Sequence, residues 1–241
     1  MSTKETLFLL NYKLITPFSI LIVFIALVGS VFAQQYIPGV AEGNYVIYGN
    51  FVGIGPGFES FNDYDWLKLE VVNVVDNKVT LLSTGLFKDG NPIPGNGTST
   101  TWNVQTGEEN GIPSTQGPII AANLMQGDAV PPLNTYSLNK TEDRTYLGVS
   151  RSVNILDLNI VTPDYESSLN YVYDRASGIL LESNSIIIQS QPESSTSEYS
   201  YSVIETNIFN APPVPEFIGI ATIIAGVIGI LTVLVLKKRI K

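Results

Sequence analysis

The chain has 241 residues and contains neither cysteine nor histidine. This composition excludes disulfide bonds, thiolate nucleophiles, cysteine- or imidazole-bound metals and a Ser–His–Asp triad. With 13 basic against 22 acidic residues, a net charge of −9, the chain also lacks the basic character typical of nucleic-acid-binding proteins.

Residues 1–33 have the pattern of a secretory signal peptide. Two lysines precede a stretch, residues 14–33, that carries no charge. A cut between Ala33 and Gln34 leaves a small residue at the last position of the leader, as signal peptidase requires. The alternative is an uncleaved N-terminal anchor, since the stretch is long enough to span a bilayer. Either interpretation takes the following chain out of the cytoplasm.

Residues 34–210 are expected to form one extracellular domain. Between residues 34 and 216 there are seven basic and 21 acidic side chains, a net charge of −14. A charge of this size favours solubility and repels polyanions. The length is that of a single domain with a sizeable core.

Alternating apolar and polar residues predict β-strands through most of this domain. In residues 66–75, for example, leucines and valines alternate with Lys68 and Glu70. Strand patterns also occupy residues 44–48, 79–87, 100–104, 145–160, 169–173, 179–188 and 199–209. We therefore expect a mainly β domain, an antiparallel meander of about eight or nine strands folded as a curved sheet, sandwich or half-barrel.

One short helix is expected within the β domain. Pro118 suits a first helical position, residues 119–125 follow as an apolar run of about two turns, and Gly127 can end the helix. The predicted fold class is therefore mainly β with one short helix, plus hydrophobic helices at both termini.

Few residues of the domain point to catalysis or metal binding. The densest group of oxygen ligands is Glu59, Asn62, Asp63 and Asp65. A calcium-binding loop requires glycine after the third ligand, where this chain has Trp66, so a solvated loop is expected. The acidic pairs at residues 108–109 and 142–143 fit turns. We predict no catalytic residue, no metal site and no cofactor.

Six aromatic residues on expected strands have two interpretations. They either line a carbohydrate or lipid pocket or pack as core and cross-strand pairs, which is the commoner role. These residues are Tyr45, Tyr48, Trp66, Trp102, Tyr171 and Tyr173. The sequence alone therefore leaves the ligand-binding residues unassigned.

Two triplets match the N-glycosylation sequon. They begin at Asn96 and Asn139, each followed by threonine two residues later. Because the domain is expected outside the cytoplasm, both asparagines are candidate glycosylation sites.

The segment 171–181 contains the sharpest hairpin signal of the chain, residues 173–179. Its sequence is Tyr-x-Tyr-Asp-x-x-x-Gly-Ile-Leu-Leu, in which Asp174 can start a turn and Gly178 can adopt positive φ. This segment resembles the hairpins of curved-sheet envelope lipoprotein carriers of the LolA/LppX type. The resemblance implies a curved sheet that shields an apolar ligand such as a lipid or isoprenoid.

The C-terminal residues predict a membrane anchor. A proline-rich stalk, residues 211–217, precedes an uncharged stretch, residues 218–236, and a basic tail, residues 237–241. A helix over residues 218–236 is about 28 Å long, close to the hydrocarbon thickness of about 30 Å. The positive-inside rule keeps the tail in the cytoplasm and the domain outside.

A three-residue motif, Pro215, Glu216 and Phe217, directly precedes the uncharged stretch. Residues 214–241 thereby resemble the archaeal PEF-CTERM sorting signal. That resemblance implies an archaeal surface protein, cut near Pro215 by an archaeosortase, with a lipid in place of the helix. The alternative is an ordinary single-pass anchor.

These features predict a protein of the cell membrane with an extracellular, non-enzymatic domain. A structural or adhesive role in the cell envelope is the first expectation. The alternative is a carrier for an apolar ligand, and an enzyme acting on glycans by paired carboxylates is a third interpretation. The expected partners are the lipid bilayer, signal peptidase and an archaeosortase as processing enzymes, and other envelope proteins, without nucleic acid.

Overall fold

The computed structural model describes residues 36–114, 117–131, 136–189 and 194–210. All of these belong to one compact unit, residues 36–214. The predicted signal peptide with its cut between Ala33 and Gln34, the sorting motif Pro215, Glu216 and Phe217, and both terminal hydrophobic helices lie outside the described residues. None of the described ranges contains a helix with the length and apolar character of a membrane span.

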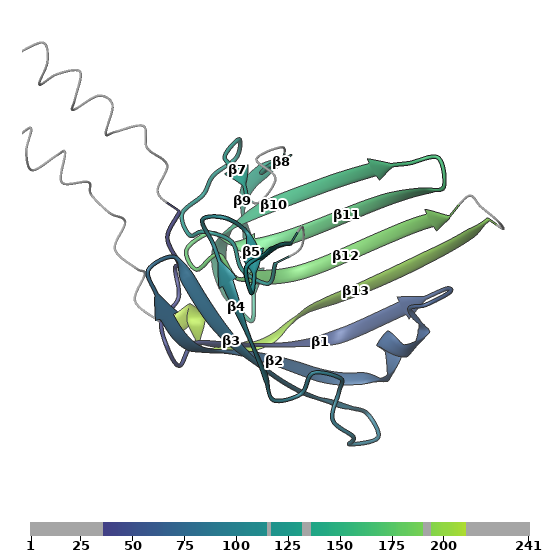
Figure 1. Ribbon diagram of the computed structural model, residues 1–241, viewed down its shortest axis with the longest axis horizontal. Helices are drawn as coiled ribbons and strands as arrows, with labels where there is room; N and C mark the ends of the chain where they lie inside the picture. The colour runs from purple at the N-terminus through teal and green to yellow at the C-terminus, as the bar shows by residue number, and fades with distance from the viewer. Residues whose placement is uncertain (1–35, 115–116, 132–135, 190–193, 211–241) are drawn as a thin grey trace, which may run out of the picture. The chain divides into compact units, whose positions relative to one another are not determined.

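Thirteen strands dominate the described residues (Figure 1). Eleven form one antiparallel sheet in the order β6-β5-β4-β3-β2-β1-β13-β12-β11-β10-β9, and β7 pairs with β8 separately. The strands are β1 (Tyr45–Ile54), β2 (Tyr64–Val75), β3 (Lys78–Phe87), β4 (Thr98–Asn103), β5 (Glu108–Glu109), β6 (Ile112–Pro113), β7 (Ala129–Val130), β8 (Tyr136–Ser137), β9 (Lys140–Tyr146), β10 (Val149–Val161), β11 (Tyr165–Asp174), β12 (Leu180–Gln189) and β13 (Ser195–Thr206). Two short 3₁₀ helices complete the fold, η1 (Glu59–Asp63) and η2 (Ile208–Asn210).

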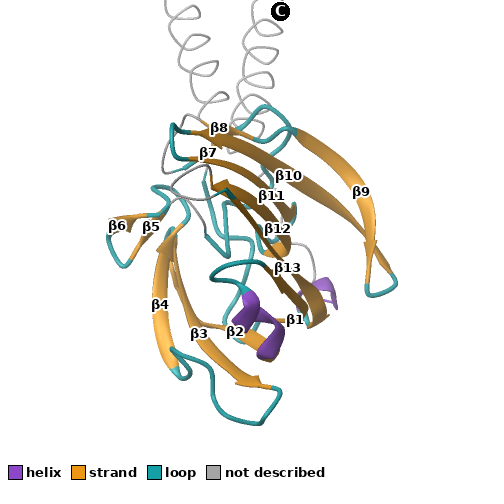
Figure 2. Ribbon diagram, turned by 90° about the vertical axis from the view of Figure 1, so that its right-hand side faces the viewer, coloured by secondary structure: helices purple, strands orange, loops and turns teal. Residues whose placement is uncertain are grey.

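The strand order follows the chain order except at one junction. β1 to β6 form one meander and β9 to β13 form a second, and the pairing of β1 with β13 joins them. Val46 near the start of β1 lies opposite Thr206 at the end of β13. Figure 2 shows that the joined sheet is strongly curved, so that β3 and β4 rise on one side and β10 to β12 on the other.

The prediction of a mainly β, antiparallel domain is confirmed, and its form is the curved sheet. The predicted number of strands was eight or nine. The structure has thirteen, of which nine contain six residues or more and four contain two. A two-residue strand is too short to show an alternating pattern, so sequence periodicity does not reveal it.

The predicted helix at residues 118–125 is wrong. This segment is a loop that crosses the β11–β12 turn: Ile119 bridges Ile179, and the N–H of Ile120 donates to the carbonyl of Gly178. The side chains of residues 119–122 are all buried. Because the loop is enclosed by other segments, its backbone groups bond to those segments rather than to one another. Its apolar run reflects this burial and not one face of a helix.

The β11–β12 hairpin is confirmed at the predicted position. Gly178 has a φ of +75°, and the buried Asp174 carboxylate accepts hydrogen bonds from the backbone N–H and the hydroxyl of Ser177. The same carboxylate accepts two bonds from the Arg151 guanidinium on β10, at 2.8 and 2.9 Å. The turn is therefore held both by Ser177 within it and by Arg151 on the neighbouring strand β10.

The two faces of the curved sheet differ in charge. Side chains alternate between the faces along each strand, and we name the face that packs on the loop of residues 117–131 the concave face. From β10 to β13, the positions on the concave face carry no charged residue within the described residues. The convex face of the same strands holds Arg151, Asp157, Glu166, Asp174, Glu182 and Glu198.

Candidate ligand-binding face

The candidate site lies on the concave face where β11, β12 and β13 run side by side. We name its five members the tyrosine–serine cluster: Tyr171, Ser183, Ser185, Tyr199 and Tyr201. Ser183 pairs with Tyr171 on one side and with Tyr201 on the other. Ser185 likewise pairs with Leu169 and with Tyr199. In both of these cross-strand sets, the serine of β12 therefore lies between two larger side chains.

Three hydroxyl groups of the cluster are buried, those of Tyr171, Ser183 and Ser185, whose residues are 3%, 2% and 0% exposed. The phenols of Tyr199 and Tyr201 are loose hydrogen-bond partners of Tyr171 and Ser183 respectively. The Ser185 hydroxyl has no partner among the described atoms. An unpaired buried hydroxyl costs about 1–3 kcal/mol, a sizeable share of a domain stability of about 5–15 kcal/mol.

The cluster is electrically neutral. Burial raises the pKa of Tyr201 to about 12, and burial also raises the pKa values of Tyr171 and Tyr173 well above the ordinary value of a tyrosine. These phenols therefore keep their protons at physiological pH. Since the surrounding concave positions carry no charge either, the cluster offers hydrogen bonds but no counter-ion to a charged ligand.

An aromatic wall extends from the cluster toward η1, formed by Phe51, Phe58, Phe61 and Tyr64. The ring of Tyr201 lies 5.7 Å from that of Phe51, and Tyr199 stacks on Phe58 at 4.9 Å between centroids. Phe61 contacts Tyr199 and Tyr64 at 5.3 and 5.4 Å. Rings at these separations attract one another, so the wall is a preformed apolar surface.

Gly53 and Asn62 hold η1 against β1 and so position the aromatic wall. The Asn62 side chain donates to the Gly53 carbonyl at 2.6 Å and accepts from its N–H at 3.0 Å. A Cβ at residue 53 would lie 1.7 Å from the carbonyl oxygen of Phe58, so only glycine permits this approach. Asn62 thus has a structural role. Within the described residues, no group of three or more acidic side chains is arranged to hold a metal ion.

The concave face next to the cluster is only partly buried. Leu67, Phe87, Ile160 and Ile187 are apolar residues of intermediate exposure there, and Tyr199 and Tyr201 share that exposure. A partly exposed apolar and aromatic surface with a few fixed polar groups is the usual lining of a site for an apolar ligand. The tyrosine–serine cluster supplies those polar groups.

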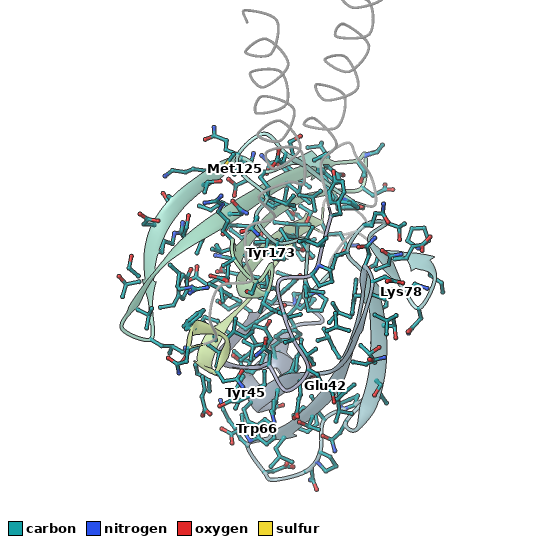
Figure 3. The ribbon with its side chains drawn as sticks, turned by 90° about the vertical axis from the view of Figure 1, so that its left-hand side faces the viewer. Glu42, Tyr45, Trp66, Lys78, Met125 and Tyr173 are labelled. Carbon is teal, nitrogen blue, oxygen red and sulfur yellow. The ribbon has the colours of Figure 1, made fainter. Side chains whose placement is uncertain are left out.

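The six aromatic residues singled out in the sequence divide between the two faces. Tyr48, Tyr171 and Tyr173 lie together on the concave face, with Trp102 on the same face in the core. Tyr45 and Trp66 belong to the convex face, where the Tyr45 hydroxyl donates to Glu205 and its ring contacts Lys68. Figure 3 shows Tyr173 in the interior and Tyr45 and Trp66 together away from it.

Sequence reasoning missed four members of the cluster: Ser183, Ser185, Tyr199 and Tyr201. A signal was present, because serines and tyrosines recur at alternate positions of β12 and β13. Serine is ordinarily a surface residue, however, and the alternating serines gave no reason to expect burial. Only the register of three strands shows that these side chains meet.

The two sequon asparagines are both exposed. Asn96 follows Gly95 in the loop between β3 and β4, and its side-chain oxygen accepts from the Gly85 N–H at 2.8 Å. Asn139 precedes β9, and its side-chain oxygen accepts from the Asp157 N–H at 2.6 Å. Both asparagines therefore lie at the surface with a defined orientation.

The acidic pair of residues 142 and 143 is separated by the sheet. Glu142 lies on the convex face, where Lys140 and Arg144 bind its carboxylate, and these partners lower its pKa. Asp143 is exposed on the other face of β9. The two carboxylates therefore lie on opposite faces of the sheet and do not meet in one site.

No protein-family model and no curated protein matches this chain.

Proposed function

We propose that this chain is a membrane-anchored, extracellular carrier that binds a neutral, largely apolar ligand on the concave face of its curved sheet. The observation that carries the proposal is the uncharged concave face of β10 to β13, on which apolar and aromatic side chains lie partly exposed beside the tyrosine–serine cluster. The anchoring and the extracellular location rest on the sequence patterns of residues 1–33 and 211–241.

Carrier function fits the site better than catalysis. The concave positions of β10 to β13 hold no carboxylate, amine or imidazole, and burial raises the pKa values of Tyr171 and Tyr201, which keeps these two phenols neutral. Proton transfer and nucleophilic attack at neutral pH need a group that can change its charge there. Binding by apolar contact with a few neutral hydrogen bonds needs none.

The test is native mass spectrometry of the full chain purified from its own membranes. A bound neutral, apolar molecule at one per chain supports the proposal. A ligand-free chain that assembles with itself or with envelope proteins contradicts it and favours the structural or adhesive role.

Two adjacent residues of β12 provide a matched pair of variants. Ile187 lies on the concave face between Ser167 and Ser197, whereas Ile188 lies on the convex face and is 40% exposed. Ile187→Asp introduces a charge where the ligand binds and is expected to abolish retention of the bound molecule. Ile188→Asp makes the same chemical change on the same strand and is expected to leave retention unchanged. Equal retention by the two variants would place the ligand elsewhere.

A further inference from the structure

The turn between β9 and β10 presents large apolar side chains to solvent. Leu147 is 49% exposed and Val149 is 38% exposed. Residues 145–150, which form the turn and its flanks, carry no charge, although the domain as a whole is strongly acidic. We name these six residues the uncharged tip.

The backbone of Leu147 is unusual for a leucine. The turn has two central residues, since Tyr146 pairs directly with Val149. Both Leu147 and Gly148 have positive φ, of +50° and +79°. Such turns favour asparagine followed by glycine, because asparagine adopts the left-handed conformation more readily than leucine does. Leucine therefore makes this turn less stable than asparagine would, and the fold itself gives no reason for it.

The uncharged tip lies beside the point at which the chain leaves the domain. The guanidinium carbon of Arg151 is 4.9 Å from the centre of the Phe209 ring in η2. Arg151 is the third residue of β10, two positions after Val149. Figure 1 shows η2 at the end of the sheet opposite the arrowhead of β10, which is the end where β10 begins. The exit of the chain and the tip are therefore neighbours.

We infer that the uncharged tip inserts into the surface of the lipid bilayer. This inference rests on the membrane anchoring in the proposed function and adds the surface through which the domain itself contacts lipid. Seven residues, 211–217, separate the end of η2 from the predicted membrane-spanning stretch. Even fully extended, that segment keeps the exit within about 30 Å of the hydrocarbon.

The chemistry of the tip fits a membrane interface. Apolar side chains on an uncharged turn gain free energy by leaving water, and no charge has to be desolvated when they do. The other end of β10 provides a contrast. Val161 is 72% exposed there, about 40 Å from Val149 along a strand of 13 residues. We expect Val161 to remain in water.

The experiment locates the tip with a fluorescent label on the full chain. Because the chain has no cysteine, a single introduced cysteine is labelled alone. Leu147→Cys and Val161→Cys are each labelled with the fluorophore NBD and reconstituted in phosphatidylcholine vesicles. One quencher is a nitroxide attached to the phospholipid, and the other is iodide in the water. The label at position 147 should be quenched by the nitroxide and shielded from iodide, and the label at position 161 should show the reverse.

Leu147→Asn tests whether the leucine itself causes the insertion. With the label placed by Val149→Cys, we expect this substitution to lower the ratio of inserted to free tip about tenfold, because burial of a leucine side chain contributes a factor of this order. Its thermal midpoint should not fall, since asparagine suits the left-handed turn. Val161→Asn in the same labelled background is the matched control and should leave the ratio unchanged.

The outcomes separate this inference from the proposed function. A chain that floats with the vesicles while its label at position 147 is open to iodide overturns the insertion and leaves the anchored carrier standing. A label shielded from both quenchers also overturns it, because a second copy of the chain then covers the tip. A chain that does not float with the vesicles overturns the proposed anchoring, and the insertion with it.

Discussion

The tyrosines of the concave face make the stability of the domain sensitive to alkaline pH. Tyr201 has its pKa raised by burial to about 12, above the ordinary value near 10. The folded state therefore favours the neutral phenol, and the stability associated with it is fully present below about pH 10. It is lost as the pH rises through about 12, because the unfolded chain then releases the proton more readily.

Replacing Tyr201 with phenylalanine should flatten this pH dependence. We expect the fall in the free energy of unfolding between pH 10 and pH 12 to shrink by roughly 2 kcal/mol, since no proton remains to be released at that position. Urea unfolding at several pH values measures the effect. A slope that does not change in Tyr201→Phe would contradict the assignment.

At the scale of elements, the loop of residues 117–131 is held by its contact with the β11–β12 turn. A Cβ at Gly178 would lie 2.0 Å from the carbonyl oxygen of Ile120, and the residue also has positive φ. Gly148, in the β9–β10 turn, has positive φ but no atom within 4 Å of such a Cβ. Substitutions at the two glycines therefore distinguish the free-energy cost of a left-handed backbone, present at both, from the cost of the steric contact with the loop, present at Gly178 alone.

Gly148→Ala should lower the free energy of unfolding by about 1–2 kcal/mol, the cost of a left-handed backbone for a residue with a Cβ. Gly178→Ala should cost at least twice as much, because the loop must also move away from the turn. Denaturant titrations of the two variants measure the difference. Equal effects would mean that the loop does not depend on this contact.

The free edge of the sheet at β9 is a second element with a testable role. Among the described strands, β9 pairs with β10 alone. Because β9 is an edge strand of an antiparallel pair, the backbone groups of alternate β9 residues point away from β10. Such an edge can pair with another chain unless a charge opposes it. Asp143 is exposed at the middle of β9, where two copies pairing in antiparallel fashion would bring their carboxylates together.

Asp143→Thr should therefore convert the domain to a dimer through β9, visible as a doubled mass in analytical ultracentrifugation. Asp143→Lys keeps a charge at the position and should remain monomeric. Asp157→Thr removes an exposed carboxylate from β10 and serves as the control. A monomeric Asp143→Thr variant would show that other features protect the edge.

The whole molecule is expected to hold its β domain outside the cell. Protease added to intact cells should therefore remove residues 36–210, and the digestion should not require lysis. Immunoblotting of cells before and after lysis measures this, with a cytoplasmic protein as the control for leakage. A domain that becomes susceptible only after lysis would contradict the proposed location.

The sequence predicts the local features of this fold but not the contacts between residues that are distant along the chain. The hairpin at residues 173–179 is confirmed because Asp174 and Gly178 lie within the turn that they create. The segment at 118–125 was assigned wrongly because its burial comes from contacts with distant segments, which an apolar run shows only as hydrophobicity. The pairing of β1 with β13 joins residues about 160 positions apart and has no local signature.

The candidate site, too, could be predicted from the sequence only where its signal is local. Tyr171 and Tyr173 were noted from their alternation, but the serines that give the site its polar groups resemble surface residues when read singly. Their meaning depends on strand register, since a shift of one residue would place Ser183 and Ser185 on the convex face.

The pairing of the first described strand with the last has a mechanical consequence. Because Val46 lies opposite Thr206, the chain enters β1 and leaves β13 at the same end of the seam between the two meanders. Tension applied through both ends would load the hydrogen bonds of this seam one pair after another, as in a zipper, rather than all together. The domain should therefore yield at low force from that end, opening the curved sheet at the strands that carry Tyr48 and Tyr201.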